Sequence, residues 1–407
     1  MIYSNVINFG CRLNACESDL IGGFVRELGL ADFVVINTCA VTAEAERKLC
    51  QTIRKLRREN PNVGIILTGC ASELRPGRYL HMDGVAGIIS NKTKLSKSEY
   101  LKYAGDSGVE IVNSTPGCQK VRGFLQVQNG CDQKCTYCIV RLTRGDNVSF
   151  PEDEVLSQAK SLLNKGYRDI ILTGVNISSY GRDQNSKHNL AHLIRYLLKN
   201  LPSLTRLGLS SLDPADIGND LVELIQSEEK LLPHIHESIQ SGDDMILKRM
   251  MRRHTRHQVI ELNERILNIR PDVIFGADLI VGFPTESDEM FDRTKLLVVG
   301  AQLSLLHIFP FSPRRGTPAF SMPKVDSGII KQRAQQLGEL AVHILGKKLS
   351  EQIGRDLIIL AEDQFSGKTN SFLPIKSLNK LVVGREYLFH CDFVDGKIIV
   401  GHPISER

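Results

Sequence analysis

The sequence lacks any apolar run of the roughly 18 to 20 residues that a membrane-spanning helix needs. Its first five residues carry no basic segment, and no signal-peptide core follows them. Neither sign of charge dominates, because the formal net charge of +5 permits an RNA partner without requiring one. Tryptophan is also absent, which excludes nothing here, and there is no internal repeat or low-complexity tract. We therefore expect a cytoplasmic protein with no membrane partner.

The chain has 407 residues, a length that predicts two or three domains rather than one. Its hydrophobic share of 42% and charged share of 24% are ordinary for a globular protein, so we expect packed cores. The ten cysteines are the unusual part of the composition. In the reducing cytosol, cysteines in this number indicate metal binding rather than disulfides.

Three of these cysteines form the most informative motif of the chain. Cys131, Cys135 and Cys138 have the spacing C-x3-C-x2-C, with Tyr137 directly before the last. Three thiolates this close in sequence can hold three irons of a 4Fe–4S cluster and leave the fourth iron open to a substrate. The alternatives are a zinc site, which usually shows two paired ligand sets and four ligands in all, or unrelated thiols. The spacing favours the cluster.

Three more cysteines follow strands of an expected N-terminal sheet. Buried strands at 6–8, 33–36, 64–67 and 85–89 alternate with amphipathic stretches at 17–28, 43–58 and 72–80, which predicts a parallel, doubly wound sheet. Cys11, Cys39 and Cys70 come after the first three strands, and the carboxyl ends of parallel strands share one edge where ligands bind. The three thiols are thus predicted to converge on a second cluster, although each alone could be a structural cysteine. No such placement applies to Cys16, Cys50, Cys118 and Cys391.

The rest of the chain divides into two further expected parts. Strands at 124–128, 169–172, 205–209, 234–239, 274–280 and 304–309, with helices between them, predict a partial six-unit βα barrel that carries the cysteine loop on its active face. After residue 349, short strands at 356–360, 369–374, 386–391 and 397–401 predict a small all-β barrel. The expected domains are 1–105, 117–346 and 349–407, with a linker in 90–120.

Several other residues are candidates for binding. Thr173 and Gly174 follow a strand and would let the backbone bond a cofactor amino group, while Ile280 and Gly282 would lie against an adenine face. Gln240 falls on the same face. Taken singly, each has an equally good interpretation as turn or packing. The basic run 248–256 is predicted either to contact phosphates or to form a solvated helix face. Its candidate RNA-binding residues are Arg252, Arg253 and Arg256.

With these residues in hand, the whole chain resembles the radical S-adenosylmethionine methylthiotransferases. Segments 10–14, 37–42 and 69–71 match the cluster domain of that family, residues 127–138 with Arg144 and Gly145 match its radical domain, and the last part is similar to its small RNA-associated (TRAM-like) β domain. Segments 172–181 and 252–256 are most similar to the branch that acts on threonylcarbamoyladenosine in tRNA. The isopentenyladenosine branch and the ribosomal-protein aspartate branch remain alternatives, as does an RNA-binding iron–sulfur protein with little catalysis.

The resemblance implies methylthiolation of C2 of a tRNA adenosine that already bears N6-threonylcarbamoyl, just 3′ of the anticodon. Two 4Fe–4S clusters are implied: one on Cys131, Cys135 and Cys138 to cleave S-adenosylmethionine, and one on Cys11, Cys39 and Cys70 to hold the inserted sulfur. S-adenosylmethionine supplies both the radical and the methyl group, with Tyr137 among its expected contacts. An aromatic C–H carbon offers no foothold for acid–base chemistry, so cofactors carry the reaction. The implied partners are tRNA, a flavodoxin- or ferredoxin-like reductant and a sulfur donor.

The sequence departs from the family pattern at four places. Arg141 stands where proline is usual, Val148 lies where a Ser-Arg-Ser stretch normally occurs, and Gly208 replaces an arginine. Glu237 replaces a leucine in an expected barrel strand, where it would cost stability unless it is paired or exposed. The six cysteines are unaffected by these departures.

Overall fold

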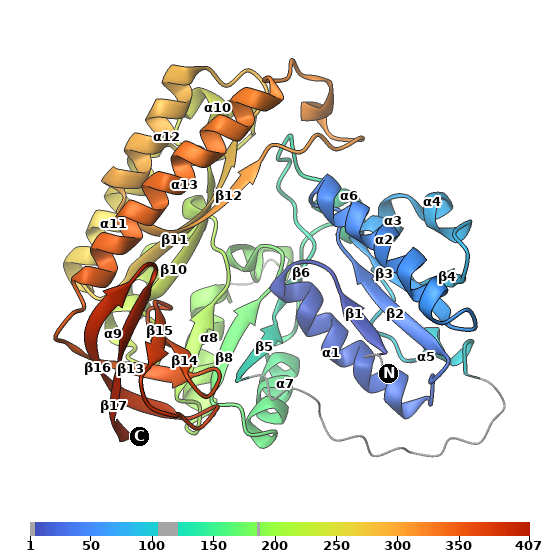
Figure 1. Cartoon of the computed structure of the whole chain (residues 1–407), viewed down its shortest axis with the longest axis horizontal. Helices are drawn as coiled ribbons and strands as arrows, with labels where there is room; N and C mark the ends of the chain where they lie inside the picture. Colours follow the sequence, from blue (N-terminus) through green and yellow to red (C-terminus); the bar gives the residue numbers. More distant parts are fainter. Residues whose placement is uncertain (1–4, 105–120, 185–187) are drawn as a thin grey trace.

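The structure is a computed structural model that describes residues 5–104, 121–184 and 188–407. It consists of three parts that follow one another along the chain, with the N-terminal part and the small C-terminal barrel on different sides of the central strands (Figure 1). Cys118, and most of the linker expected in 90–120, lie outside the described residues. Within the part of the chain that the structure describes, no helix is long and apolar enough to cross a membrane.

The N-terminal part is a four-stranded parallel sheet in the order β1-β2-β3-β4. Its strands are rich in β-branched residues, which suit a buried pleated surface. Helices cover both faces: α2 packs on one, around Ile36 and Leu67, and α1 and α5 pack on the other, around Val35 and Ile66. The predicted doubly wound parallel sheet is therefore confirmed. Its elements are β1 (Val6–Asn8), α1 (Arg12–Glu27), β2 (Phe33–Thr38), α2 (Ala43–Glu59), β3 (Gly64–Gly69), α3 (Cys70–Leu74), α4 (Pro76–Leu80), β4 (Val85–Ile88) and α5 (Ser98–Leu101).

The central part contains six parallel strands in two three-stranded sheets, β5-β8-β9 and β10-β11-β12. Isolated parallel bridges between Leu207 and Leu231 and between Leu212 and Glu237 join the two sheets. The result is the predicted partial βα barrel. Its strands are β5 (Arg122–Gln126), β8 (Asp169–Thr173), β9 (Arg206–Leu209), β10 (His234–Gln240), β11 (Ile274–Val281) and β12 (Leu303–Pro310).

Helices pack around the outside of the central strands and form the largest apolar core with them. A short antiparallel hairpin, β6 (Gln128–Asn129) with β7 (Val148–Ser149), frames the cysteine loop after β5. The helices are α6 (Val140–Arg144), α7 (Glu152–Asn164), α8 (Leu190–Asn200), α9 (Asn219–Ser227), α10 (Asp244–Arg249), α11 (Arg256–Ile269), α12 (Asp288–Gly300) and α13 (Ser327–Ser350), with 3-10 turns η1 (Ile177–Ser179), η2 (Arg182–Gln184), η3 (Pro214–Asp216) and η4 (Pro318–Ser321).

The C-terminal part is a closed five-stranded barrel, as predicted, but one of its strands was expected in the wrong place. The stretch 369–374 contains the turn between β14 and β15, where Phe372 has a φ of 65°. The Phe372 side chain leaves the barrel and packs against Ile171 and Leu232 of the central part, so its hydrophobicity serves an interface. The strands are β13 (Asp356–Ala361), β14 (Ser366–Thr369), β15 (Pro374–Ser377), β16 (Glu386–Asp395) and β17 (Ile398–Glu406).

Candidate metal centres

The three N-terminal cysteines gather at one edge of the first sheet, as the sequence predicted. Cys11 caps the start of α1, Cys39 follows β2 directly, and Cys70 opens α3 at the end of β3. Burial raises the pKa of the Cys39 thiol to about 11, and Cys70 and Cys11 are close enough to raise it further. A Cβ on Gly10, whose φ is 127°, would lie 3.3 Å from the Cys39 sulfur, so only glycine leaves this approach open.

Polar side chains that the sequence did not single out hold this edge in place. The Asn14 amide donates to the carbonyls of Phe9 and Thr38, at 2.9 and 3.1 Å. The Thr38 hydroxyl accepts from the backbone N–H of Ala71 at 3.1 Å and so fixes the start of α3. The Asn91 amide lies 4.0 Å from the Cys70 sulfur. These contacts link the three loops that carry the cysteines, and they could not be read from local spacing.

The second set of cysteines, Cys131, Cys135 and Cys138, lies on the loop between β6 and α6, within the connection from β6 to β7. Gly130, with a φ of 68°, lets the loop pass the hairpin, because a Cβ there would meet the Asp146 carbonyl oxygen. The Val140 N–H donates to the Cys138 sulfur at 3.4 Å, and the Arg252 guanidinium lies 3.6 Å from the Cys135 sulfur. Donors aimed at sulfur are suited to thiolates, which are the metal-binding form of cysteine.

The arrangement of the thiols fits a multi-iron cluster better than a single ion. Among the described residues, two groups of three ligand atoms lie within 4.8 Å of one another, and neither contains a cysteine. The sulfurs within each set are nevertheless close enough to act on one another. Burial is the main cause that raises the pKa of the Cys138 thiol to about 12, and Cys135 and Cys131 raise it further. Cys70 and Cys11 have the same effect on the Cys39 thiol. Both sets can thus hold a group larger than one ion, such as a 4Fe–4S cluster.

A buried ion network joins the two parts of the molecule that carry the cysteine sets. Arg144, which ends α6, donates to Glu17 at 2.7 Å and to Asn14 at 2.6 Å, and Glu17 also accepts from Lys94 at 2.5 Å. Burial alone would raise the pKa of Glu17, but the two cations hold it below its ordinary value. The cysteine sets are close as well, because Cys70 contributes to the raised pKa of Cys138.

The expected cofactor-binding residues lie at the carboxyl ends of the central strands, on the side of the cysteine loop. Tyr137 meets the Phe283 ring edge-on at 6.5 Å, and both belong to an apolar cluster that includes Ile280. Gln240 ends β10 with a φ of 79°, and Gly282 follows β11 with a φ of 72°. The structure therefore brings Tyr137 and Ile280 together and places Gln240 and Gly282 at the ends of neighbouring strands.

Gln128 is a residue that sequence reasoning missed, and it connects Thr173 and Gly174 to the cysteine loop. Its side-chain oxygen accepts from the backbone N–H groups of Val175 and Asn176, at 2.9 and 2.8 Å. Its side-chain nitrogen donates to the Gly130 carbonyl at 2.7 Å. One buried amide thus fixes the loop after β8 against the loop that begins with Cys131. Gln128 stands three residues before Cys131, within the segment 127–138 that carries the resemblance, and this position is the sequence signal that could have found it.

The basic run 248–256, expected either to contact phosphates or to form a solvated helix face, is divided by the fold. The Arg252 side chain is 5% exposed and turns inward to pair with Asp213 at 3.2 Å and to donate to the Ser238 carbonyl at 2.6 Å. The Arg253 side chain is 41% exposed and pairs with Asp216 at 2.6 Å. Arg256 begins α11 and is partly exposed. Arg252 therefore faces the cysteine loop rather than solvent.

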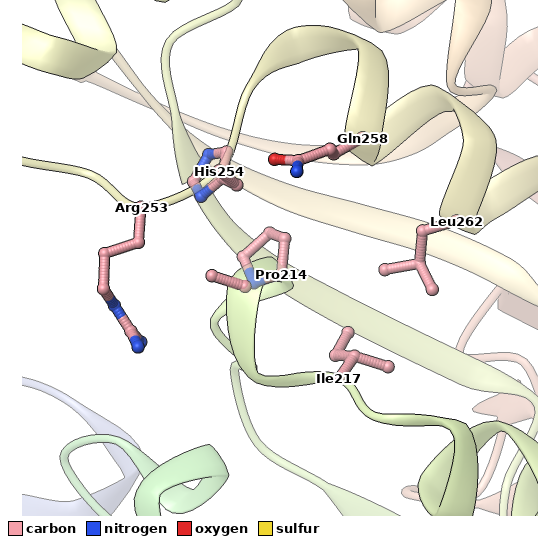
Figure 2. A pocket seen from close by; sticks show the side chains of 7 residues that line it. Pro214, Ile217, Arg253, His254, Gln258 and Leu262 are labelled. Atoms are coloured by element: carbon pink, nitrogen blue, oxygen red, sulfur yellow. The ribbon is translucent and has the colours of Figure 1, made fainter.

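A cavity of about 250 Å³ lies beside this divided run (Figure 2). Its lining comes from η3, from α11 and from Arg253 and His254, which precede α11. The His254 side chain is buried and lies 3.2 Å from the Ile239 carbonyl. The lining residues are Pro214, Ala215, Ile217, Arg253, His254, Gln258 and Leu262.

A polar wall on the inner face of β10–β12 is another feature that the sequence did not reveal. The Asp278 carboxylate bonds to His236 at 2.9 Å and to His307 at 3.1 Å. Burial would raise the pKa of Asp278, but the two histidines hold it at about 2. Two cations from other parts of the molecule reach the same region. Arg12 interacts with Asp278, and Lys368 lies over the Phe372 ring at 5.7 Å and is close enough to Arg12 for repulsion.

Arg12 and Lys368 form no ion pair with any residue that the structure describes. Burial lowers the pKa of both side chains, in Lys368 with added repulsion from Arg122 and Arg12. Burial of a cation carries a desolvation cost, which Asp278 offsets in part for Arg12 and no described anion offsets for Lys368, so a bound anion would be favourable here. The inner face therefore has the chemistry of a site for a carboxylate or a phosphate.

Comparisons with known proteins agree with this geometry. Residues 125–298 match the family described as the Radical SAM superfamily, and residues 4–90 match the one described as Uncharacterized protein family UPF0004. The fold is similar to the radical S-adenosylmethionine methyltransferase TsrM from Kitasatospora setae, with a TM-score of 0.56 and 12% identity over 77% of this chain and 76% of that one. At this identity the likeness concerns the fold alone.

Relatives over nearly the full length are more similar in sequence. A threonylcarbamoyladenosine tRNA methylthiotransferase MtaB from Rickettsia prowazekii is 41% identical over 93% of this chain and 92% of its own. A protein of the same name from Thermotoga maritima is 36% identical over 87% and 85%. A tRNA-2-methylthio-N(6)-dimethylallyladenosine synthase from Bacillus pumilus is 30% identical over 92% and 79%.

Proposed function

The chain belongs to the radical S-adenosylmethionine methylthiotransferases, and from this premise we propose that it adds a methylthio group to C2 of N6-threonylcarbamoyladenosine in tRNA, next to the anticodon. The observation that carries the proposal is the closeness of the two cysteine sets, since Cys70 acts on Cys138 and Arg144 joins the two parts that carry them. A reaction that both activates a C–H bond and delivers sulfur needs two such centres close together. A tRNA substrate is also consistent with the names of the relatives.

Two groups of this chain's residues would hold the cofactors. A 4Fe–4S cluster on Cys131, Cys135 and Cys138 would supply the electron that cleaves S-adenosylmethionine, and one on Cys11, Cys39 and Cys70 would hold the sulfur that is inserted. Arg252 and the Val140 N–H stabilise negative charge on the first set of sulfurs. We further propose that Tyr137, Thr173, Gly174, Gln240, Ile280 and Gly282 form the binding site for S-adenosylmethionine, because they surround the cysteine loop at the strand ends.

Arg144 compensates the charge of the second set of sulfurs while it joins the two parts. Although burial alone would lower the pKa of Arg144, Glu17 and the nearby thiols of Cys70 and Cys11 hold it above its ordinary value. The guanidinium thus stays charged, and its bonds to Glu17 and Asn14 fix the distance between the two centres. Orientation of this kind is a large part of what a protein contributes to a cofactor reaction.

Arg12 and Lys368 are the residues that we propose for substrate choice. N6-Threonylcarbamoyladenosine ends in a carboxylate and a hydroxyl, whereas isopentenyladenosine ends in a hydrocarbon. The two cations could pair with the carboxylate, and the wall of His236, Asp278 and His307 offers further polar contacts. A hydrocarbon there would leave buried polar groups without partners, so the enzyme is expected to reject the isopentenyl substrate strongly.

A competition experiment tests this assignment. Reconstituted enzyme receives equal amounts of tRNA with threonylcarbamoyladenosine and tRNA with isopentenyladenosine, and mass spectrometry of the nucleosides identifies the product. We expect the methylthio group almost wholly on the first. Lys368→Leu should lower kcat/KM for that tRNA at least tenfold, whereas Lys376→Leu, at an exposed lysine of the same small barrel, should leave it unchanged. Product mainly on the isopentenyl tRNA would overturn the substrate assignment and leave the family intact.

We also propose that the exposed part of the basic run contacts tRNA. Arg253 and Arg256 are the candidates, because Arg252 is committed to Asp213 and to the cysteine loop. A reducing partner and a sulfur donor complete the set of partners that the reaction requires.

A further inference from the structure

The segment that follows β12 contacts both parts of the molecule that carry cysteines. The Ala319 N–H donates to the Thr136 carbonyl at 2.9 Å, and Thr136 lies inside the cysteine loop. At the other end of the segment, the Ser312 hydroxyl accepts from the backbone N–H of Ala43 at 3.2 Å. Ala43 begins α2, shortly after the end of β2. Segment 311–322 therefore forms a second connection between the two cysteine sets, apart from the buried ion network described above.

A buried ion pair anchors this segment to the N-terminal part. The Arg314 side chain is 4% exposed, and it donates to the Glu46 Oε1 atom at 2.7 Å and to the Ser312 hydroxyl at 3.2 Å. Glu46 lies in the first turn of α2, and its other oxygen accepts from Arg78 at 3.1 Å and lies 3.7 Å from Arg75. Glu46 thus gathers three guanidinium groups, one of which comes from the central part of the molecule.

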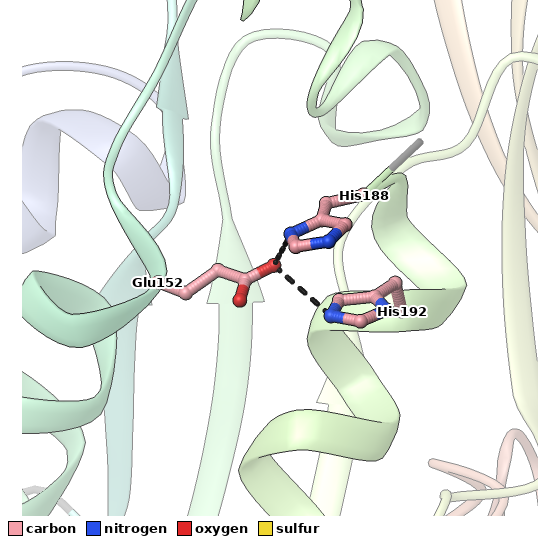
Figure 3. Close-up of side chains that lie close together, drawn as sticks. All are labelled: Glu152, His188 and His192. Carbon is pink, nitrogen blue, oxygen red and sulfur yellow. Dashed lines mark ion pairs between the residues drawn. The ribbon is translucent and has the colours of Figure 1, made fainter. Parts of the chain in front are cut away.

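Glu152 is another carboxylate with several basic neighbours, and the comparison shows what is distinctive about Glu46. The Glu152 Oε1 atom lies 3.0 Å from His188 Nδ1 and 3.3 Å from His192 Nε2 (Figure 3). These three side chains are partly exposed and belong to the central part alone, near the starts of α7 and α8. Water screens pairs of this kind, so they hold little in place. The pair of Arg314 with Glu46 is buried and joins two parts, so removal of either partner should affect both parts.

Three guanidinium groups around one carboxylate leave an excess of positive charge, and a thiol lies close to it. Burial is the main cause that lowers the pKa of Arg314, while Glu46 opposes that effect and Cys39 is close enough to oppose it as well. Arg75 and Arg78 are partly exposed, so water screens much of their charge, whereas Arg314 is enclosed. Cysteine binds metal as the negatively charged thiolate. The charge of Arg314 is therefore suited to stabilising metal-bound sulfur beside it.

We propose that Arg314 is a positioning residue for sulfur insertion, which fixes the N-terminal cysteines relative to the cysteine loop and keeps a positive charge beside their sulfurs. Arg144 already holds α1. Arg314 holds α2 through Glu46 and, through the contact of Glu46 with Arg75, the end of α3. The three N-terminal cysteines lie at or just before the starts of these three helices, so the two arginines together fix all of them. This role rests on the proposed function, since the separation of the two centres matters only where a radical formed at one requires sulfur from the other.

A redox titration of the reconstituted full-length protein tests the effect of the charge. Electron paramagnetic resonance follows the midpoint potential of the N-terminal centre in protein whose cysteine loop carries alanine in place of its three cysteines, so that only one centre contributes. We expect Arg314→Met to make this potential more negative, because a nearby positive charge favours the reduced form. Glu46→Gln removes a negative charge and should shift the potential in the opposite direction. Arg315→Met is the matched control, because Arg315 is the next residue along the chain but is exposed, and it should leave the potential unchanged.

Product analysis of the enzyme with both centres loaded and tRNA present tests the positioning. Arg314→Met should lower the ratio of methylthiolated nucleoside to 5′-deoxyadenosine about tenfold or more, because a small displacement of the centres separates radical formation from sulfur insertion. Arg314→Lys retains the charge but not the planar group that bonds Glu46 and Ser312 together, so it should keep the wild-type potential and recover only part of the ratio. Arg315→Met should retain the wild-type ratio.

Three results would overturn the proposal: an unchanged potential in Arg314→Met, an unchanged product ratio in that variant, or shifts of the same sign in Arg314→Met and Glu46→Gln. If Arg314→Met folds poorly and binds less iron than the wild type, Arg314→Lys and Glu46→Gln decide, because both keep a side chain of similar size at the pair. A wild type that binds both clusters but forms no methylthiolated nucleoside would refute the proposed function instead, and the potentials would still show whether Arg314 acts on the N-terminal centre.

Discussion

The two cysteine sets each bring three thiols together, but they do so in different ways. Cys131, Cys135 and Cys138 lie on one loop, so their proximity follows from short spacing along the chain. Cys11, Cys39 and Cys70 come from three loops and are brought together because β1, β2 and β3 are parallel and in register, with Asn8 opposite Asn37 and Thr38 opposite Gly69. A compact motif needs only a loop, whereas a dispersed one needs a whole sheet.

Loss of the compact set should have the largest effect. Replacing Cys131, Cys135 and Cys138 by alanine should abolish cleavage of S-adenosylmethionine to 5′-deoxyadenosine, because no other thiols replace the lost ligands. Bound iron should fall from about eight to about four atoms per chain, since each cluster holds four. Iron analysis and chromatography of 5′-deoxyadenosine measure both. Cys391→Ala, at a buried cysteine of the C-terminal barrel, is the control and should retain both values.

Loss of one thiol from the dispersed set should stop sulfur insertion but not cleavage of S-adenosylmethionine. Cys39→Ala should eliminate methylthiolated nucleoside while cleavage of S-adenosylmethionine continues, because the compact set does not depend on the three strand ends. Both products are measured in the same reaction by mass spectrometry. If Cys39→Ala still forms full methylthiolated product, the two sets do not have separate roles.

The network between the two sets allows a matched pair of substitutions on one helix. Arg144→Met leaves Glu17 without its second cation in a buried site and should lower the free energy of unfolding by about 3–5 kcal/mol. Arg141→Met, in the same helix α6, removes a pair with Asp146 whose side chains are 43% and 71% exposed, and should cost less than about 1 kcal/mol. Anaerobic denaturation measures both. Equal losses would show that the network does not connect the two parts.

The buried carboxyl of Glu237 in the central barrel should make the stability of that part depend on pH. Burial raises the pKa of Glu237 to about 8, against a smaller lowering by Asn263. The native state therefore binds more protons than the unfolded state between pH 4.5 and 8, and stability falls as pH rises through that window.

Glu237→Gln should remove this dependence and be more stable than the wild type by roughly 2–4 kcal/mol at pH 9, with little difference near pH 4.5. Hydrogen exchange should show the change in β10 and not in β2, because Glu237 lies in the barrel. A wild type whose β10 protection does not fall between pH 5 and 9 would contradict the raised pKa.

The smallest effect concerns tRNA affinity and should affect neither cysteine set. Arg256→Gln should weaken tRNA binding uniformly and reduce the slope of log K against log salt by about 1, because one phosphate contact is lost. Cleavage of S-adenosylmethionine without tRNA should stay unchanged. Filter binding over a range of salt measures the slope, and an unchanged slope would return this residue to an ordinary solvated position.

Features that depend on short spacing could be predicted from the sequence. The compact cysteine motif, the strand–helix alternation and the placement of Cys11, Cys39 and Cys70 after strands all follow from local patterns. The stretch 369–374 misled us, because Phe372 has the apolar character of a strand residue and uses it at an interface. Arg252 looked like part of a surface run, since a charge in sequence carries no sign of the buried Asp213 that it meets.

Glu237 shows what the sequence can predict and what requires the tertiary structure. The sequence could state only that a carboxyl in a barrel strand must be paired or exposed, and the structure buries it against Asn263 at 3.1 Å. In the same way, Arg144 with Glu17, and Glu152 with its two histidines, join positions that are distant along the chain. Neighbours along the chain were enough to predict most strands and helices and to nominate six thiols as metal ligands, because these inferences rest on local patterns. Which charges meet became known from the fold, because electrostatic energy depends on distance and burial in space.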